Sequence, residues 1–220
     1  LGKDGGRTVL ISGCIDTQKV HISSAIASGY KYMLIVTSDE AKARKMCDDA
    51  SFFNKEAIYY PAKDAIFYSA DVHGNQITGE RLRCISRIIN HSSTGEGVLT
   101  VVTTMDGIAD RLIPVERFKE AVITLDYSSE IEPEKLAKKL VAMGFVRTGM
   151  VEDKGQFAIR GGIIDIFSYT DEAPVRIELW DTEVDSIRMF DVESQRSIER
   201  LQSYSIFPAT EYIFTEDELK

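Results

Sequence analysis

The sequence predicts an α/β protein in which a Rossmann-like or P-loop-like domain with a parallel sheet precedes a small α+β domain with an antiparallel sheet. Up to about Leu125, continuous apolar runs alternate with helical patterns, which is typical of parallel strands covered on both faces. Beyond Asp126, apolar and polar residues alternate with a period of two, which is typical of antiparallel strands with one buried face. We therefore place the first domain at 1–125 and the second at 126–201. Residues 202–220 are expected to be a return strand and the start of a following segment of the first domain.

In the first domain, apolar runs predict strands over 8–12, 32–38, 57–61, 98–104 and 120–126. Helical spacing predicts helices over 17–29, 39–53 and 79–91. Gly29 is placed as the C-cap of the first helix, and Ser38 or Asp39 as the N-cap of the second. Strands that alternate with helices in this order indicate βαβ units.

In the second domain, Pro133 begins a helix that Gly144 ends, because proline suits the first helical turn and glycine the position after the last. Alternation predicts strands within 155–168, 174–181 and 183–191, with a tight turn at Asp181 and Thr182. Thr215 precedes Glu218 by three residues, which is the spacing of a capping box and predicts a helix there. We expect the chain to be part of a longer protein.

Composition limits the possible functions. The net charge of −9 and the pI near 5.0 argue against broad binding of nucleic acid or of anionic membranes. No apolar run approaches the length of a membrane span, and no signal peptide is recognisable, so a cytoplasmic location is expected. The three cysteines are far apart, and the histidines fit no metal-ligand spacing. We expect no metal and no cofactor.

The stretch "VLISGCIDTQKVHIS" has the layout of a phosphate-binding loop, which requires G-x-x-x-x-G-K-[ST]. Gly13 and Lys19 fit this pattern. Gln18 replaces the second glycine, and Val20 replaces the hydroxyl that would hold magnesium. We therefore interpret the segment as a strand-to-helix turn whose phosphate loop is degenerate. With no other catalytic motif in the sequence, we expect no enzyme activity from this chain.

Gly155 to Leu201 carries the motifs G-x-F-A-x-R-G-G-I-x-D-I-F, P-x-R-I-E-x-aromatic, D-S-I-R and F-D-x-x-[ST]-Q-R-S in order. This stretch resembles the second domain that the excision-repair subunit UvrB shares with the N-terminal UvrB-homology region of bacterial transcription-repair coupling factors (Mfd). The first 125 residues resemble the first domain (1A) of UvrB more loosely. The broken phosphate loop, and the short spacer between Tyr68 and the helix near Thr78, favour the coupling factors over UvrB.

The resemblance implies a non-catalytic adaptor that recruits the excision-repair protein UvrA to stalled RNA polymerase. In that family ATP-driven translocation, DNA binding and RNA-polymerase binding belong to other modules. The family's UvrA-binding positions correspond here to Arg160, Arg176 and Trp180. We expect truncation of each to weaken UvrA binding and to leave the fold intact, because alternation places none of them on the core face.

In "VRIELW", a period of two puts Arg176, Glu178 and Trp180 on one face of a strand and the aliphatic residues on the other. Arginine and tryptophan are enriched in binding hot spots, so this face is a candidate interface. The structural alternative is that Trp180 packs under a loop while Arg176 pairs with Glu178 or Asp165.

Two further functions stay open from the sequence. One is a divergent nucleotide-binding NTPase or helicase-core fragment of the UvrB type, using Gly13 and Lys19. The other is a DNA-binding module that contacts the phosphate backbone through dispersed cations, which are Arg147, Lys154, Arg160 and Arg188.

Overall fold

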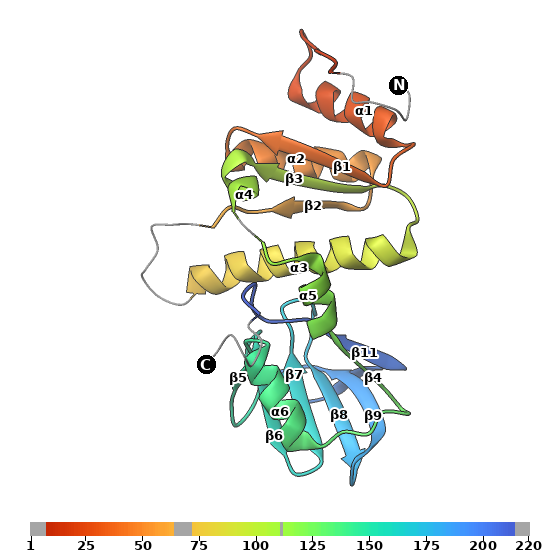
Figure 1. Ribbon diagram of the computed structural model, residues 1–220, viewed down its shortest axis with the longest axis vertical. Coiled ribbons are helices and arrows are strands. Elements are labelled where there is room, and N and C mark those ends of the chain that lie inside the picture. The colour runs from red at the N-terminus through yellow and green to blue at the C-terminus, as the bar shows by residue number, and fades with distance from the viewer. Residues whose placement is uncertain (1–7, 64–71, 111, 214–220) are drawn as a thin grey trace. The chain divides into compact units, whose positions relative to one another are not determined.

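The computed structural model describes residues 8–63, 72–110 and 112–213 (Figure 1). The chain divides into two compact units, Leu1–Lys63 with His91–Ala109, and Asp64–Asn90 with Asp110–Lys220. The boundaries of these compact units differ from the domain boundaries predicted at residues 125 and 201. The predicted boundaries divide the chain by its resemblance to other proteins, and they stay a prediction. The capping-box helix expected at Thr215 lies outside the described residues.

The first unit contains a three-stranded parallel sheet in the order β1-β3-β2. Its elements are α1 (Asp16–Ala27), β1 (Tyr32–Thr37), α2 (Glu40–Phe53), β2 (Ala57–Tyr60), β3 (Leu99–Thr104) and α4 (Met105–Ala109). Helices α1 and α2 supply Val20, Ala43, Met46 and Ala50 to a core shared with Val102 of β3. The parallel sheet and the helical crossovers predicted from the apolar runs are thus confirmed.

Two predicted strands differ from the structure. Residues 8–12 form no strand and are exposed, with Leu10 90% accessible. Extended backbone counts as a strand only when it is paired, and none of the described strands pairs with this segment. Residues 120–126 end in β4 (Ile123–Asp126), which pairs antiparallel with β11 (Ser203–Ile206) instead of joining the parallel sheet. The return strand expected after residue 201 is β11.

The second unit is built on a six-stranded sheet in the order β10-β9-β8-β7-β6-β5. Its elements are most of α3 (Val72–Thr94), then α5 (Val115–Ala121), β4, α6 (Pro133–Ala142), β5 (Val146–Arg147), β6 (Gln156–Arg160), β7 (Ile163–Phe167), β8 (Val175–Trp180), β9 (Glu183–Phe190), β10 (Ser197–Arg200) and β11. All neighbours in the large sheet run antiparallel except β5 and β6. The α+β class predicted for this half is confirmed.

One face of this sheet is the core of the second unit (Figure 1). Leu136, Ala137 and Leu140 of α6 pack with a set of strand residues that includes Phe157, Ile164, Ile166, Ile177 and Ile187. Burying a leucine side chain contributes roughly 2 kcal/mol, so α6 holds this face firmly. The opposite face carries polar residues together with a smaller buried cluster of Val151, Ala158 and Phe167. Among the described residues, no helix combines the length and the hydropathy that crossing a bilayer requires.

A buried ion pair stabilises the second unit at α3. The side chain of Arg81 is fully buried, and its Nε donates to Oε1 of Glu211 at 2.5 Å while Nη2 donates to Oε2 at 3.2 Å. Its Nη1 lies 3.3 Å from Oδ2 of Asp110. This contact joins α3 to a segment 130 residues later in the chain.

Replacing Arg81 with methionine keeps most of its volume but leaves the buried carboxylate of Glu211 without its guanidinium. We expect Arg81→Met to lower the free energy of unfolding by about 3–5 kcal/mol, measured by urea denaturation. Lys135→Met is the control, because its pair with Glu132 is exposed and contributes about 0–1 kcal/mol. Equal losses in the two variants would contradict this role for Arg81.

Candidate functional site

The candidate site is the face of the six-stranded sheet that points away from the α6 core. We call it the polar face and define it by Arg160, Asp165, Arg176, Glu178, Trp180, Ser186 and Arg188. Strand register places Asp165, Arg176 and Arg188 opposite one another on β7, β8 and β9. The next row holds Ile163, Glu178 and Ser186. The period of two predicted from "VRIELW" is confirmed, since Ile177 is fully buried on the other face.

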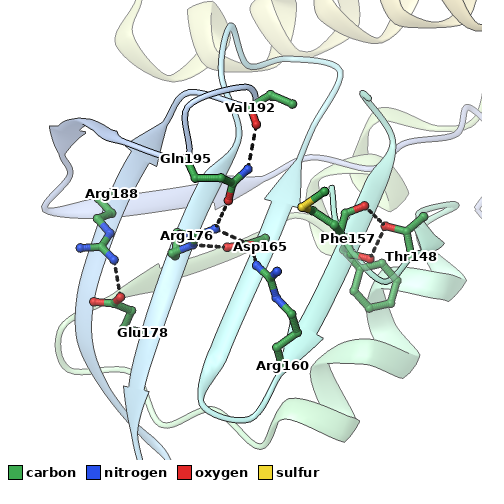
Figure 2. Close-up of polar contacts among 10 residues, drawn as sticks. Thr148, Phe157, Arg160, Asp165, Arg176, Glu178, Arg188, Val192 and Gln195 are labelled. Carbon is green, nitrogen blue, oxygen red and sulfur yellow. Dashed lines mark hydrogen bonds and ion pairs between the residues drawn. The ribbon is translucent and has the colours of Figure 1, made fainter. Parts of the chain in front are cut away.

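The carboxylate of Asp165 lies at the centre of the polar face (Figure 2). It is 1% exposed and accepts from Arg176 twice, Nε to Oδ1 at 2.7 Å and Nη2 to Oδ2 at 2.9 Å. Nη2 of Arg160 also donates to Oδ2 of Asp165, at 2.5 Å. One buried carboxylate thus brings together two of the three predicted site residues.

Arg176 also contacts Gln195 and Phe190 in addition to Asp165. Its Nη2 also donates to Oε1 of Gln195 at 2.8 Å, and its guanidinium carbon lies 4.3 Å from the ring centre of Phe190. Hydrogen bonding to Asp165 raises the pKa of Arg176 above its ordinary value, so the group stays charged. With 12% of its side chain exposed, Arg176 is mainly a buried member of the network.

Trp180, the third predicted residue, does not join this network. It ends β8 beside the two-residue turn Asp181–Thr182 and is 80% exposed. The turn predicted there is confirmed, with Asp181 at a φ of 58°. An exposed tryptophan at a hairpin end is available to a partner, so the alternative that it packs under a loop is wrong.

The β6–β7 turn fixes Arg160 at the same end of the sheet as Trp180. Gly161 has a φ of 61°, and Arg160 pairs directly with Ile163, so the two glycines form a tight hairpin turn. A Cβ added to Gly162 would lie 2.8 Å from the carbonyl oxygen of Leu179. The glycine pair therefore serves a turn and a close backbone approach.

A second ion pair extends the polar face. Glu178 accepts from Oγ of Ser186 at 2.7 Å. It also accepts from Nη2 of Arg188 (Figure 2). Sequence reasoning placed Arg188 only in the DNA-binding alternative and gave Asp165 only as a possible partner of Arg176. The signal for Asp165 was present, because an acidic residue between Ile164 and Ile166 in a buried strand needs a cationic partner.

The residues of the degenerate phosphate loop stabilise the start of α1 and its packing. Gly13 has a φ of 76°, Oε1 of Gln18 accepts from the backbone N–H of Ile15 at 3.2 Å, and Val20 is fully buried in the core. Nζ of Lys19 donates to Asp16 at 3.1 Å, and this bond lowers the pKa of Asp16. The first turn of α1 therefore carries a carboxylate where a nucleotide would need to place phosphate.

The dispersed cations of the DNA-binding alternative are each engaged within the chain. Arg147 pairs with Glu134 at 3.3 Å, Lys154 donates to the backbone oxygen of Asp171, and the other two are Arg160 and Arg188. No cluster of three or more metal-binding side chains occurs within the residues that the structure describes.

Comparison with known proteins shows which families the chain resembles. Residues 123–212, which include the whole polar face, match the family model described as the UvrB interaction domain. Over 98% of its length the chain is 38% identical to the transcription-repair-coupling factor of Bacillus subtilis (strain 168). It is 35% identical, again over 98% of its length, to those of Staphylococcus aureus (strain Mu50) and Staphylococcus haemolyticus (strain JCSC1435). The resemblance inferred from the sequence is thereby confirmed, and the chain spans 18% of the length of each of these relatives.

The network changes what truncation of Arg176 is expected to do. Arg176→Ala leaves the buried carboxylate of Asp165 with Arg160 as its remaining cationic partner, so we expect it to lower the free energy of unfolding by about 3 kcal/mol. Trp180→Ala, the matched control at an exposed position, is expected to change it by less than about 0.5 kcal/mol. Chemical denaturation of both variants checks this. Equal stability of the two would contradict a structural role for Arg176.

The loop geometry predicts that the chain binds no ATP. Isothermal titration calorimetry with ATP and magnesium is expected to give no measurable binding, because Lys19 is paired and Val20 cannot ligand a metal. Val20→Thr is expected to cost about 1–2 kcal/mol of stability, since its hydroxyl would enter an apolar core. Micromolar, magnesium-dependent binding by the unmodified chain would overturn this interpretation.

Proposed function

We propose that this chain is the UvrA-binding adaptor region of a transcription-repair coupling factor, and that UvrA binds the polar face. The observation that carries the proposal is that Arg160, Arg176 and Trp180 share that face, at the positions the family resemblance assigns to UvrA binding. The relatives are named transcription-repair-coupling factors, and the polar face lies in the stretch that matches the UvrB interaction domain.

Charge supports a protein partner with acidic groups at the contact. The polar face carries three guanidinium groups and two carboxylates, whereas the chain as a whole has a net charge of −9. The locally cationic face attracts an acidic patch of a partner, and the net negative charge of the chain as a whole disfavours broad contact with nucleic acid. The exposed indole of Trp180 adds apolar area of the kind that dominates binding energy at interfaces.

In the complete protein we propose that this region brings UvrA to RNA polymerase stalled on DNA, in the cytoplasm. Binding of RNA polymerase and DNA, and ATP hydrolysis, would reside in other modules of the coupling factor. The chain itself would contribute binding and no catalysis. This agrees with the use of its phosphate-loop residues as structural elements.

Affinity for purified UvrA tests the proposal. We expect the chain to bind UvrA, and we expect Arg160→Ala and Trp180→Ala each to cost on the order of 2 kcal/mol, or about 30-fold in Kd. Trp180 is exposed, so Trp180→Ala is expected to unfold at the temperature of the unmodified chain. Arg160→Ala removes one of the two cationic partners of Asp165 and is expected to stay folded with a lower unfolding temperature, because Arg176 still pairs with both oxygens of Asp165.

Arg147→Ala is the matched control, because Arg147 is similarly exposed and also paired with a carboxylate but lies on β5, outside the polar face. It is expected to bind UvrA as the unmodified chain does. Absence of binding by the folded, unmodified chain would overturn the proposed partner. Equal losses in all three variants would show that the polar face is not the contact surface.

A further inference from the structure

We infer that Asp165 is a positioning residue for partner binding, which holds Arg160 in the orientation that the partner recognises, and that Arg176 acts mainly as a clamp on Asp165. The inference rests on the proposed function. It divides the roles of two arginines that the sequence resemblance treats alike, and it gives a role to a buried residue that does not itself contact the partner.

Exposure separates the two arginines. The side chain of Arg176 is 12% exposed, and its Nε and Nη2 are committed to Asp165 and Gln195. The side chain of Arg160 is 43% exposed, and Asp165 is its sole polar partner among the described residues, through Nη2. Arg160 therefore keeps Nε, Nη1 and the second N–H of Nη2 for an incoming acceptor, and it is the arginine that can contact a partner.

The geometry of the unused N–H donors of Arg160 indicates which chemical group of the partner it would bind. A guanidinium that uses one N–H of Nη2 still presents a parallel pair of donors, the second N–H of Nη2 and an N–H of the nitrogen on that side, which matches the two oxygens of a carboxylate. We therefore assign an Asp or Glu side chain of the partner to Arg160. The cationic balance of the polar face attracts the same group.

Asp165 can position Arg160 because it is itself immobilised. It is 1% exposed on the central strand β7, and Arg176 grips both of its oxygens. Gln195, which holds Nη2 of Arg176, donates from Nε2 to the carbonyl of Val192 at 2.8 Å (Figure 2). An arginine held in its bound geometry loses less side-chain entropy on binding, so the network raises affinity without touching the partner.

A double-mutant cycle separates positioning from general structural support. Binding to purified UvrA is measured for the unmodified chain, Arg160→Ala, Asp165→Asn and the double variant. Asparagine has the shape of aspartate but sets an amide or a neutral oxygen against the arginine donors. If Asp165 acts through Arg160, Asp165→Asn is expected to weaken binding about tenfold in the unmodified chain and less than about twofold in the Arg160→Ala background. Equal losses in both backgrounds would overturn the inference.

The second measurement needs no substitution and covers the case in which Asp165→Asn does not fold. In the free chain, ¹⁵N relaxation of the arginine Nε–H groups reports how rigidly each side chain is held. We expect Arg160 to be as rigid as the backbone and Arg147, paired only with an exposed glutamate, to be mobile. Equal mobility of Arg160 and Arg147 would overturn the inference.

The outcomes distinguish the two proposals. No UvrA binding by the folded, unmodified chain refutes the proposed function. Binding that Arg160→Ala weakens, with additive effects of Asp165→Asn, keeps the proposed function and refutes the positioning role of Asp165.

Discussion

The polar face is organised by one constraint, the need of the buried carboxylate of Asp165 for cationic partners. A carboxylate that is 1% exposed on a central strand is tolerated only when charged donors satisfy it, and Arg176 and Arg160 supply them from the two neighbouring strands. Pairing with Asp165 brings Arg160 and Arg176 together on the polar face. The two arginines and Asp165 add a net charge of +1, whereas Arg188 and Glu178 balance each other. The same contact that stabilises the sheet thus shapes the surface we propose for binding.

The fold could be predicted where the sequence pattern is strong. Continuous apolar runs gave the three parallel strands, and the alternation in "VRIELW" gave the orientation of β8 correctly. The pattern failed at residues 8–12, whose apolar residues are typical of a strand but pair with none of the strands that the structure describes. It also failed for β4, because pairing with β11 is a contact between residues about 80 positions apart that no local pattern contains. Register and pairing are tertiary properties.

The sequence predicts which residues lie at the site. It predicts less well how each of them is buried and hydrogen-bonded. Alternation and family resemblance together indicated Arg160, Arg176 and Trp180. They treated the three alike, since burial of a long side chain cannot be read from its position on a strand. Arg176 lies on the solvent side of the sheet and is nevertheless mostly covered by Gln195 and Phe190. The loop that carries Gln195 contacts Arg176 of β8. The alternation of apolar and polar residues along a strand does not predict such a contact.

The most direct test of binding through the polar face uses the chain's single tryptophan. Trp180 gives one indole N–H signal in a ¹⁵N-labelled chain, so its response to unlabelled UvrA can be assigned without ambiguity. The account predicts that this signal, together with the Nε–H of Arg160, shifts or broadens on addition of UvrA, while signals from α1 and β1 stay unchanged. Binding that leaves both polar-face signals in place and moves those of the first unit would contradict it.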